Sequence, residues 1–449
     1  MKLSALQKKV VRSGISFFAA ILVYLVLPES MPPEAKKMLA GLVCTSGLWI
    51  FEVFPLYVTS LLVVVVAPFL AFDLGELAQK PELLNTFFSP LSNPVIILFL
   101  GGFMMARALS AHRVDQFIAS TVISTIAPRP AILLATVMVI TAGLSMWLSN
   151  TATTVMMLAV VGPIIYQIKS DNPFRKALAL SVPFAASIGG MGTPVGTPPN
   201  AIAVGLLGQS GVHLSFFQWM EGGVPLVLGI SVVTFFILIR LFPSTESRFL
   251  FEFKQSERLS RPGKIALGII SGGVLLWLTT PLHHLSESWV ALLCGTTLLV
   301  TGIISLKDIR ELEWHIILLM WGGLALGQGM EVSGMSAWVA SQAIFQSSPA
   351  VLIATFAFIS TGLSTVMNDT ATANLVLPIA LGVPCSHAAL LAFVTAVSSS
   401  IALSLPISCA PNALLFSLNI VRGREFFKAG ILVTLAATAM IIGGALLAL

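Results

Sequence analysis

The sequence of 449 residues predicts an all-α protein that crosses a membrane many times and consists of two related halves. Three observations predict this class: a scarcity of charge, the lengths of the apolar segments, and a motif that occurs twice. Only 10% of the residues are charged, 56% are hydrophobic, and the mean hydropathy is +0.96. Because soluble chains carry about 25% charged residues, lipid must be the solvent for much of this surface.

The composition excludes a disordered chain, a nucleic-acid-binding protein and a secreted disulfide scaffold. The four cysteines are isolated, with no C-x-x-C or Cys/His metal spacing. The basic segment Met1–Arg12 precedes an apolar run without a small-residue cleavage site. It therefore predicts an N-terminal anchor helix within residues 1–37 and not a cleaved signal peptide.

Eleven segments are long and apolar enough to be predicted as membrane spans, since about 20 helical residues cross the bilayer core. Pro and Gly interrupt two of the spans, 177–208 and 386–418. The predicted domains are the anchor, a first repeat 38–242, a cytoplasmic connector 243–264 and a second repeat 265–449. The spans are 13–27, 38–54, 55–73, 91–110, 177–208, 221–242, 265–281, 288–305, 314–330, 386–418 and 427–448.

Two further apolar stretches, near 130–166 and 347–383, predict re-entrant hairpins. Each is 37 residues long and has polar residues at its centre. Non-helical backbone at membrane depth is tolerated where protein or a water-filled cavity covers it. The alternative is a chain of twelve or thirteen plain spans.

The basic residues predict the orientation in a cell (inner) membrane. With the N-terminus cytoplasmic, the hairpins returning to their own sides and the C-terminus outside, 21 of the 24 Lys and Arg residues lie inside. Plain spans in place of the hairpins would move Lys169, Arg175 and Lys176 outside. The charge distribution thus favours the hairpins.

An internal repeat relates the halves. Segments 142–160 and 361–379 share seven of nineteen residues at an offset of 219. Gly101-Gly102 matches Gly322-Gly323 at an offset of 221, and Pro199-Asn200 matches Pro411-Asn412 at an offset of 212. The predicted topology gives the halves opposite orientations. Inverted repeats with interrupted segments are typical of transporters that bind substrate near the midplane.

Each hairpin centre carries a polar cluster, which costs free energy at membrane depth unless every group finds a partner. Helix starts favour anions, and carbonyls at helix ends coordinate small cations. Back-bonding of Ser and Thr to their own helix is the alternative. Asp369 is the only acidic residue between Glu331 and Glu425, which makes it a candidate functional residue. The clusters are Ser149, Asn150, Thr151, Thr153 and Thr154, and Asn368, Asp369, Thr370, Thr372 and Asn374.

The two interrupted spans are predicted to unwind, because Pro removes a backbone donor and Gly relaxes φ. Unwinding would expose carbonyl and N–H groups beside each hairpin; a simple kink is the alternative. The break residues are Pro198, Pro199 and Asn200 in the first half and Ala410, Pro411 and Asn412 in the second.

These motifs resemble the divalent anion:sodium symporter family, which carries dicarboxylates, citrate or sulfate. The resemblance spans nearly the whole chain. It includes the Glu52–Pro55 and Phe99–Phe103 segments, the Ser-Asn-Thr triplet at 149–151 and the Gly-Thr-Pro-Pro-Asn run at 196–200. It implies a homodimer whose transport domains move like elevators against scaffold domains. It also implies amphipathic arm helices near Leu109–Ala127 and Val332–Gln346.

By this resemblance, the first half keeps the expected binding residues and the second half departs from the pattern. The usual Ser-Asn-Thr is Asn368-Asp369-Thr370, and Cys409-Ala410 replaces Thr-Pro. A carboxylate about 4 Å from an anion costs about 4 kcal/mol at an effective dielectric of 20, unless a cation or a proton cancels its charge. The substrate residues implied are Asn150, Thr151, Thr197, Asp369, Thr370 and Cys409. The sodium residues implied are Ser149, Asn150, Gly196, Asn368 and Asp369, together with carbonyls of the unwound spans.

The sequence therefore predicts a secondary active transporter that carries a C4-dicarboxylate or citrate with sodium. A proton at Asp369 would make it wholly or partly proton-coupled. A sodium-independent exchanger, a sulfate carrier and a passive channel are the alternatives. An enzyme is not expected, since there is no H-E-x-x-H signature and only one carboxylate is predicted at membrane depth. The expected partners are a small anion, the lipid bilayer and a second copy of the chain, with no nucleic acid.

Overall fold

The computed structural model describes the chain except residues 1–4, 126–128, 250–257, 343–344 and 407. Within the described residues all regular structure is helical. The first half contains α1 (Ala5–Val26), α2 (Pro33–Ile50), α3 (Leu56–Ala71), α4 (Leu74–Gln79), η1 (Pro81–Leu84), α5 (Asn85–Phe88), η2 (Ser89–Ser92), α6 (Pro94–Ala111), α7 (Val114–Thr125), α8 (Pro130–Ser145), α9 (Asn150–Gln167), α10 (Phe174–Gly190), α11 (Pro198–Gln209) and α12 (Phe216–Leu241).

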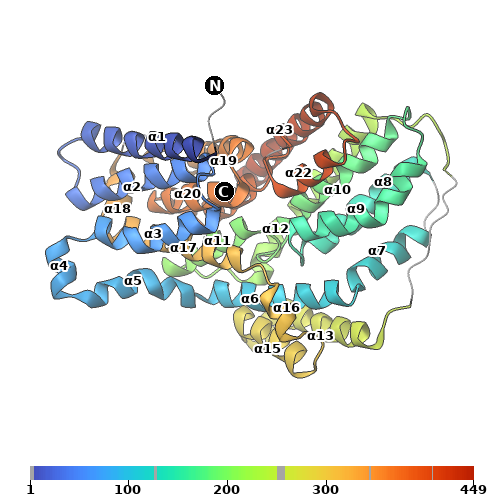
Figure 1. Cartoon of the computed structure of the whole chain (residues 1–449), viewed down its shortest axis with the longest axis horizontal. Coiled ribbons are helices and arrows are strands. Elements are labelled where there is room, and N and C mark those ends of the chain that lie inside the picture. Colours follow the sequence, from blue (N-terminus) through green and yellow to red (C-terminus); the bar gives the residue numbers. More distant parts are fainter. Residues whose placement is uncertain (1–4, 126–128, 250–257, 343–344, 407) are drawn as a thin grey trace.

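The second half repeats this order with different connections (Figure 1). It contains α13 (Arg261–Leu278), α14 (Thr280–His283), α15 (Glu287–Val300), α16 (Leu306–Arg310), α17 (Trp314–Val332), α18 (Met335–Ser341), α19 (Pro349–Val366), α20 (Asp369–Gly382), α21 (Ala388–Ser399), α22 (Ala410–Ser417) and α23 (Gly423–Leu447).

Each of the eleven predicted spans contains a helix, and the two interrupted spans are the broken pairs α10–α11 and α21–α22. By length and composition alone, five helical segments of the described chain can cross a membrane, or six if the bent pair α17–α18 counts as one span. The helices α3, α8, α15 and α21 are also apolar but shorter, at 12 to 16 residues.

Close helix packing explains the repeated Gly-Gly pair. Helix α6 packs against α15 in the same way that α3 packs against α17. A Cβ atom on Gly101 would overlap the backbone of Ala291, and one on Gly322 would lie 2.7 Å from the Ser60 Cα. Glycine is therefore needed at matching positions of the two halves, where helix backbones touch.

Short helices follow α6 and α17 where the amphipathic arms are expected. Arg113 precedes α7 with a φ of +54°, and Gly334 precedes α18 with a φ of +76°. These two positions are again 221 residues apart. The same left-handed turn thus redirects the chain in both halves, with a bend of 69° between α17 and α18.

Both predicted hairpins are helix pairs with short breaks. Helices α8 and α9 pack on α10, and α19 and α20 pack on α21. Helix α11 also contacts α20, and α22 contacts α9, so each broken span touches the hairpin of the other half. This exchange brings elements of both halves together in the interior of the molecule.

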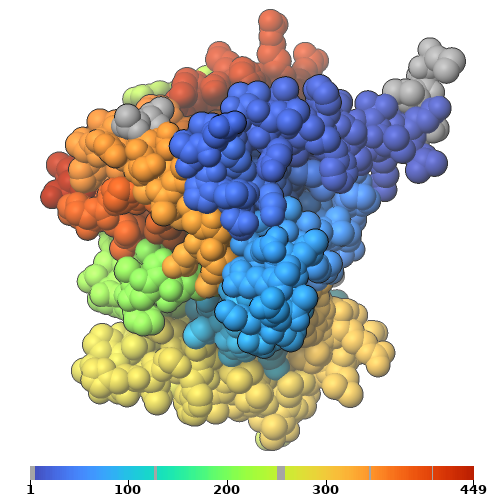
Figure 2. All heavy atoms as spheres, turned by 90° about the vertical axis from the view of Figure 1, so that its left-hand side faces the viewer, coloured from blue at the N-terminus to red at the C-terminus, as the bar shows by residue number. Residues whose placement is uncertain are grey.

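The surface carries many apolar side chains. Helix α1 runs along one edge of the molecule (Figure 2), and only 11% of its most apolar window is buried. Leu25 and Val26 are 73% and 75% exposed. Such a face is suited to lipid.

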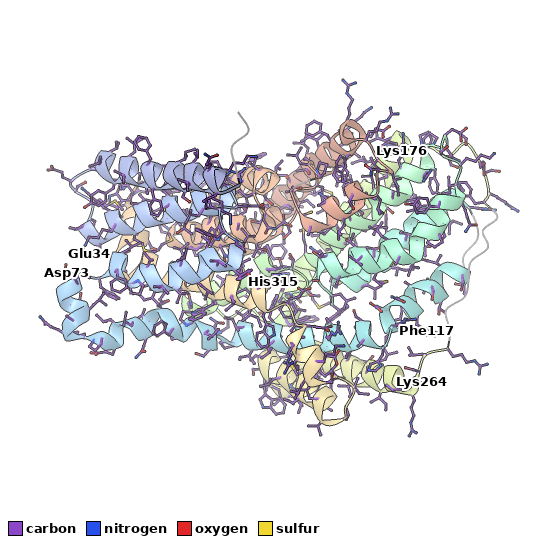
Figure 3. The ribbon with its side chains drawn as sticks, in the orientation of Figure 1. Glu34, Asp73, Phe117, Lys176, Lys264 and His315 are labelled. Atoms are coloured by element: carbon purple, nitrogen blue, oxygen red, sulfur yellow. The ribbon has the colours of Figure 1, made fainter. Side chains whose placement is uncertain are left out.

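Charged residues gather at opposite ends of the long axis (Figure 3). Glu34 and Asp73 lie at one end, Lys176 and Lys264 at the other, and His315 near the middle. The end with Lys176 and Lys264 is the one that the sequence assigns to the inside, and this orientation stays a prediction.

Candidate functional site

The first hairpin turns at a capped helix start. Ser149 is the N-cap of α9, and its Oγ accepts a hydrogen bond from the Ala152 N–H at 3.4 Å. The Oδ1 of Asn150 accepts one from Ser145 Oγ at 2.8 Å. The Asn150 amide packs on Gly190, where a Cβ atom would overlap Oδ1. The glycine at the end of α10 thus makes room for a predicted binding residue.

The first break is tied to this tip. Asn200 Nδ2 donates to the carbonyls of Gly190 at 3.0 Å and Thr193 at 2.8 Å. The Thr193 hydroxyl donates to the carbonyl of Met146, next to the hairpin turn. Gly196 lies against the Gly190 carbonyl, where a side chain would not fit. The break and the hairpin therefore form one unit.

The second hairpin repeats the plan with a carboxylate. The Oδ1 of its N-cap, Asn368, accepts from the Thr370 N–H at 2.9 Å. Asp369 is only 8% exposed, and its Oδ1 lies 3.0 Å from Ser364 Oγ. The Ser364–Asp369 pair occupies the same repeat positions as Ser145–Asn150. Ser364 Oγ also makes a short hydrogen bond to the carbonyl of Ser399.

The second break is held by an equivalent asparagine. Asn412 Nδ2 lies 3.2 Å from both the Leu405 carbonyl and Ser408 Oγ. Leu405 and Asn412 match Thr193 and Asn200 at the offset of 212. The Pro and Ala residues predicted at the breaks fill the first positions of α11 and α22, where the backbone needs no N–H donor. The backbone is non-helical before these two helices, at residues 191–197 and at 400–406 and 408–409, so the predicted break residues themselves lie in the first turn of the helix that follows each break.

Several buried oxygen atoms at the hairpins and beside the two breaks accept no hydrogen bond from the described residues. Buried polar atoms normally have a partner, and hydroxyl and amide oxygens are ligands for hard cations. Among the described residues no group of three His, Cys, Asp or Glu could hold a metal ion. The oxygens are Oγ1 of Thr153, Thr154 and Thr372, and Oδ1 of Asn200, Asn374 and Asn412.

The remaining predicted residues differ in exposure. Thr197 and Thr370 are 3% and 7% exposed, whereas Thr151 is exposed at the hairpin tip. Cys409 Sγ lies 4.0 Å from Ser187 Oγ of α10. The replacement of threonine by Cys409 therefore lies where an element of the second half meets one of the first half.

One site residue was missed by the sequence prediction. Ser149 Oγ donates to Glu313 Oε1 at 2.7 Å, across 164 positions of the chain. Glu313 is half-buried at the start of α17, close to His315 in the middle of the molecule (Figure 3). From the sequence, Glu313 was expected in an inside loop, so Asp369 was predicted to be the single carboxylate at membrane depth. No sequence pattern pairs Glu313 with Ser149.

A helical fold in which each half places a hairpin beside a broken span is the arrangement expected of a secondary transporter. The model of the citrate transporter family matches residues 47–398 and 274–449. The chain belongs to this family, which confirms the resemblance to divalent anion:sodium symporters.

Named relatives agree with this class. The chain is 32% identical to an uncharacterized transporter of Haemophilus influenzae, over 96% of each chain. It is 29% identical to the sodium-dependent dicarboxylate transporter SdcS of Staphylococcus aureus, over 92% of this chain and 86% of SdcS. The protein is thus a multi-pass membrane transporter for a small anion.

Solved structures share the fold. The Alcanivorax borkumensis YdaH transporter aligns with a TM-score of 0.58 at 13% identity, over 87% of this chain and 97% of its own. Neisseria gonorrhoeae MtrF aligns with a TM-score of 0.57 at 9% identity, over 95% of this chain and 96% of its own. At these identities the likeness supports the fold alone.

Proposed function

We propose that the protein carries a C4-dicarboxylate or citrate across the cell membrane together with sodium. The observation that supports this most is the pairing of hairpins and breaks from both halves. It supplies helix starts for an anion, and buried oxygens without a partner, such as those of Thr153, Thr154 and Thr372, lie one helical turn from the residues assigned to sodium. The sodium-dependent dicarboxylate transport named for SdcS, a relative over most of the chain, supports the same substrate class and coupling ion.

In the proposed cycle the cations bind first. Oxygens of Ser149, Asn150 and Gly196 hold sodium at the first hairpin, and those of Asn368 and Asp369 hold it at the second. Their positive charge offsets the carboxylate of Asp369. The anion then bridges the tips through Asn150, Thr151, Thr197, Thr370 and Cys409, assisted by the N–H groups at the starts of α9 and α20.

Movement follows from this charge balance. The hairpins with their broken spans form a transport domain that slides against a scaffold containing α2, α3, α6, α13, α15 and α17. A filled site crosses the apolar scaffold at lower cost than a partly filled one, so the ions and the substrate move together. The scaffold pairs two copies into a homodimer, with the N-terminus cytoplasmic and the C-terminus outside.

Uptake into proteoliposomes tests the proposal. Purified protein is reconstituted and offered labelled succinate, citrate, 2-oxoglutarate or sulfate, with or without an inward sodium gradient. Sodium-stimulated accumulation of an organic anion is expected. Equal uptake with and without sodium would favour an exchanger, and preference for sulfate would favour an inorganic anion carrier.

Proton coupling at Asp369 is a second candidate, favoured by the hydrogen bonds of Ser364. This hydroxyl has one proton but lies within hydrogen-bond distance of both Asp369 Oδ1 and the Ser399 carbonyl. If Ser364 donates to the carbonyl, the contact with Asp369 needs a proton on the carboxyl group. The arrangement therefore suits a protonated Asp369.

Asp369→Asn separates the candidates. If Asp369 exchanges a proton in each cycle, the variant loses uptake driven by a proton gradient, and its remaining uptake no longer varies with pH. If sodium alone drives uptake, a proton gradient has no effect in either protein, and the pH profiles coincide. Ser364→Ala keeps the carboxyl group of Asp369 and removes its serine partner, so it controls for loss of the serine pairing.

A further inference from the structure

The loop before α17 places a second carboxylate against the candidate site. Glu313 reaches Ser149 at the turn of the first hairpin with an Oε1–Oγ distance of 2.7 Å. Its side chain does not cap its own helix, α17. The carboxylate is thus directed to the hairpin from an element that packs mainly on α3.

The charge of Glu313 is not balanced by a base among the described residues, where it forms no ion pair. Arg107, which approaches the same loop, is held by Asp308 at 2.9 Å and by Glu311. The hydrogen bond from Ser305 and the charge of Arg107 lower the pKa of Asp308 to about 2, so the Arg107–Asp308 pair stays ionised. Arg107 therefore already has two partners.

The contact breaks the symmetry of the repeat. At the offset of 221 that aligns the Gly-Gly pairs, the counterpart of Glu313 is Ser92. Ser92 is neutral and exposed, and its hydroxyl donates to the Ser89 carbonyl at 2.7 Å. The carboxylate that contacts the turn of the first hairpin therefore has a neutral serine as its counterpart in the repeat.

The position of Glu313 makes it a competitor of an anion. Ser149 has one hydroxyl proton and gives it to Glu313, so it cannot donate to a substrate carboxylate at the same time. Asn150 and Thr151 follow directly in the chain, within one helical turn of this negative charge. In a partly buried site, like charges at such distances repel strongly.

We propose that Glu313 sets the affinity for the substrate anion and its need for cations. This role rests on the proposed function, because it concerns how tightly the first hairpin holds the transported anion. In the empty site the Glu313 carboxylate accepts the hydrogen bond from Ser149 and repels a dianion. Cations at the hairpin screen this charge and allow the anion to bind.

The test is the KM for succinate in proteoliposomes at limiting and at saturating sodium. Glu313→Gln keeps an acceptor for Ser149 but removes the charge. It is expected to lower the KM about 10-fold at limiting sodium, and less at saturating sodium, where bound cations already screen Glu313. Glu313→Asp keeps the charge but is too short for the contact, and its KM is expected to stay close to wild type.

Two further variants complete the design. Glu311→Gln removes a carboxylate from the same loop that pairs with Arg107, and its KM is expected to match wild type. Glu313→Ser copies the counterpart Ser92 and replaces Glu313→Gln if that variant does not fold, as judged by gel filtration and melting temperature. It is expected to lower the KM in the same way.

Three outcomes discriminate. An unchanged or raised KM in a folded Glu313→Gln or Glu313→Ser protein would overturn the proposal. Equal shifts in Glu313→Gln and Glu313→Asp would overturn it too, because a variant that keeps the charge would then behave like one that lacks it. If wild type shows sodium-dependent uptake of neither succinate nor citrate, the proposed function itself fails, and this result is distinct from any difference between the variants.

Discussion

At the scale of single residues, the two carboxylates of the site differ in how they can be found. Asp369 stands out because no other charge lies near it in the sequence, and it interrupts a repeated motif. Glu313 is hidden among the loop charges Asp308, Arg310 and Glu311. Its partner Ser149 is 164 positions away, and the counterpart of Glu313 in the first half of the repeat is a serine, Ser92. Only tertiary contact identifies Glu313.

Gly190 is predicted to act on binding through Asn150. In Gly190→Ala the new methyl group overlaps the Asn150 amide and displaces it from the position where Ser145 holds it. We expect the KM for the transported anion to rise about 10-fold, the equivalent of one lost hydrogen bond of about 1.4 kcal/mol. Uptake kinetics in proteoliposomes measure this.

Gly143→Ala is the matched control for Gly190→Ala, since a Cβ atom on this glycine of α8 meets nothing within 4 Å. Its KM is expected to equal that of wild type. A Gly190→Ala protein with unchanged KM and unchanged melting temperature would show that Asn150 does not need this room.

At the scale of helices, the sequence predicts what periodicity and local chemistry control. The hairpins follow from polar clusters and apolar length, and the breaks follow from Pro and Gly, although Pro198–Asn200 and Ala410–Asn412 lie in the helices that start after the breaks. The arms were expected from the family resemblance alone. The short helices α4, α5, α14 and α16 were not predicted, because four to six residues carry no periodic signal. The contacts between helices of different halves, such as α11 with α20, depend on packing between distant segments and were not predicted.

Gly322 is predicted to matter for stability through helix packing. Gly322→Ala places a methyl group against the Ser60 backbone of α3, and rigid backbone cannot yield as a flexible side chain would. Overpacking of this kind costs about 1–3 kcal/mol, so the melting temperature in detergent is expected to fall.

Gly362→Ala serves as the reference for Gly322→Ala, because its Cβ would meet nothing within 4 Å. It is expected to keep or slightly raise the melting temperature, since alanine favours helix over glycine. Equal melting temperatures for the two variants would contradict a tight α3–α17 contact.

At the scale of the whole molecule, the scarcity of charge and the repeat predict the architecture. The family match confirms the class of transporter, while the orientation, the domain boundaries and the homodimer stay predictions. The chemistry of the site comes from both halves at once: Ser145–Asn150 and Ser364–Asp369 are matched pairs, whereas Glu313 and Cys409 break the match. Both exceptions change the charge or the donors available to an anion.

The most direct test of this account is uptake of labelled succinate by proteoliposomes under an imposed sodium gradient, with the membrane potential and the proton gradient clamped to zero. We predict accumulation above the equilibrium level that collapses when the sodium gradient is dissipated. Uptake that reaches the same level with potassium in place of sodium would contradict sodium-coupled transport.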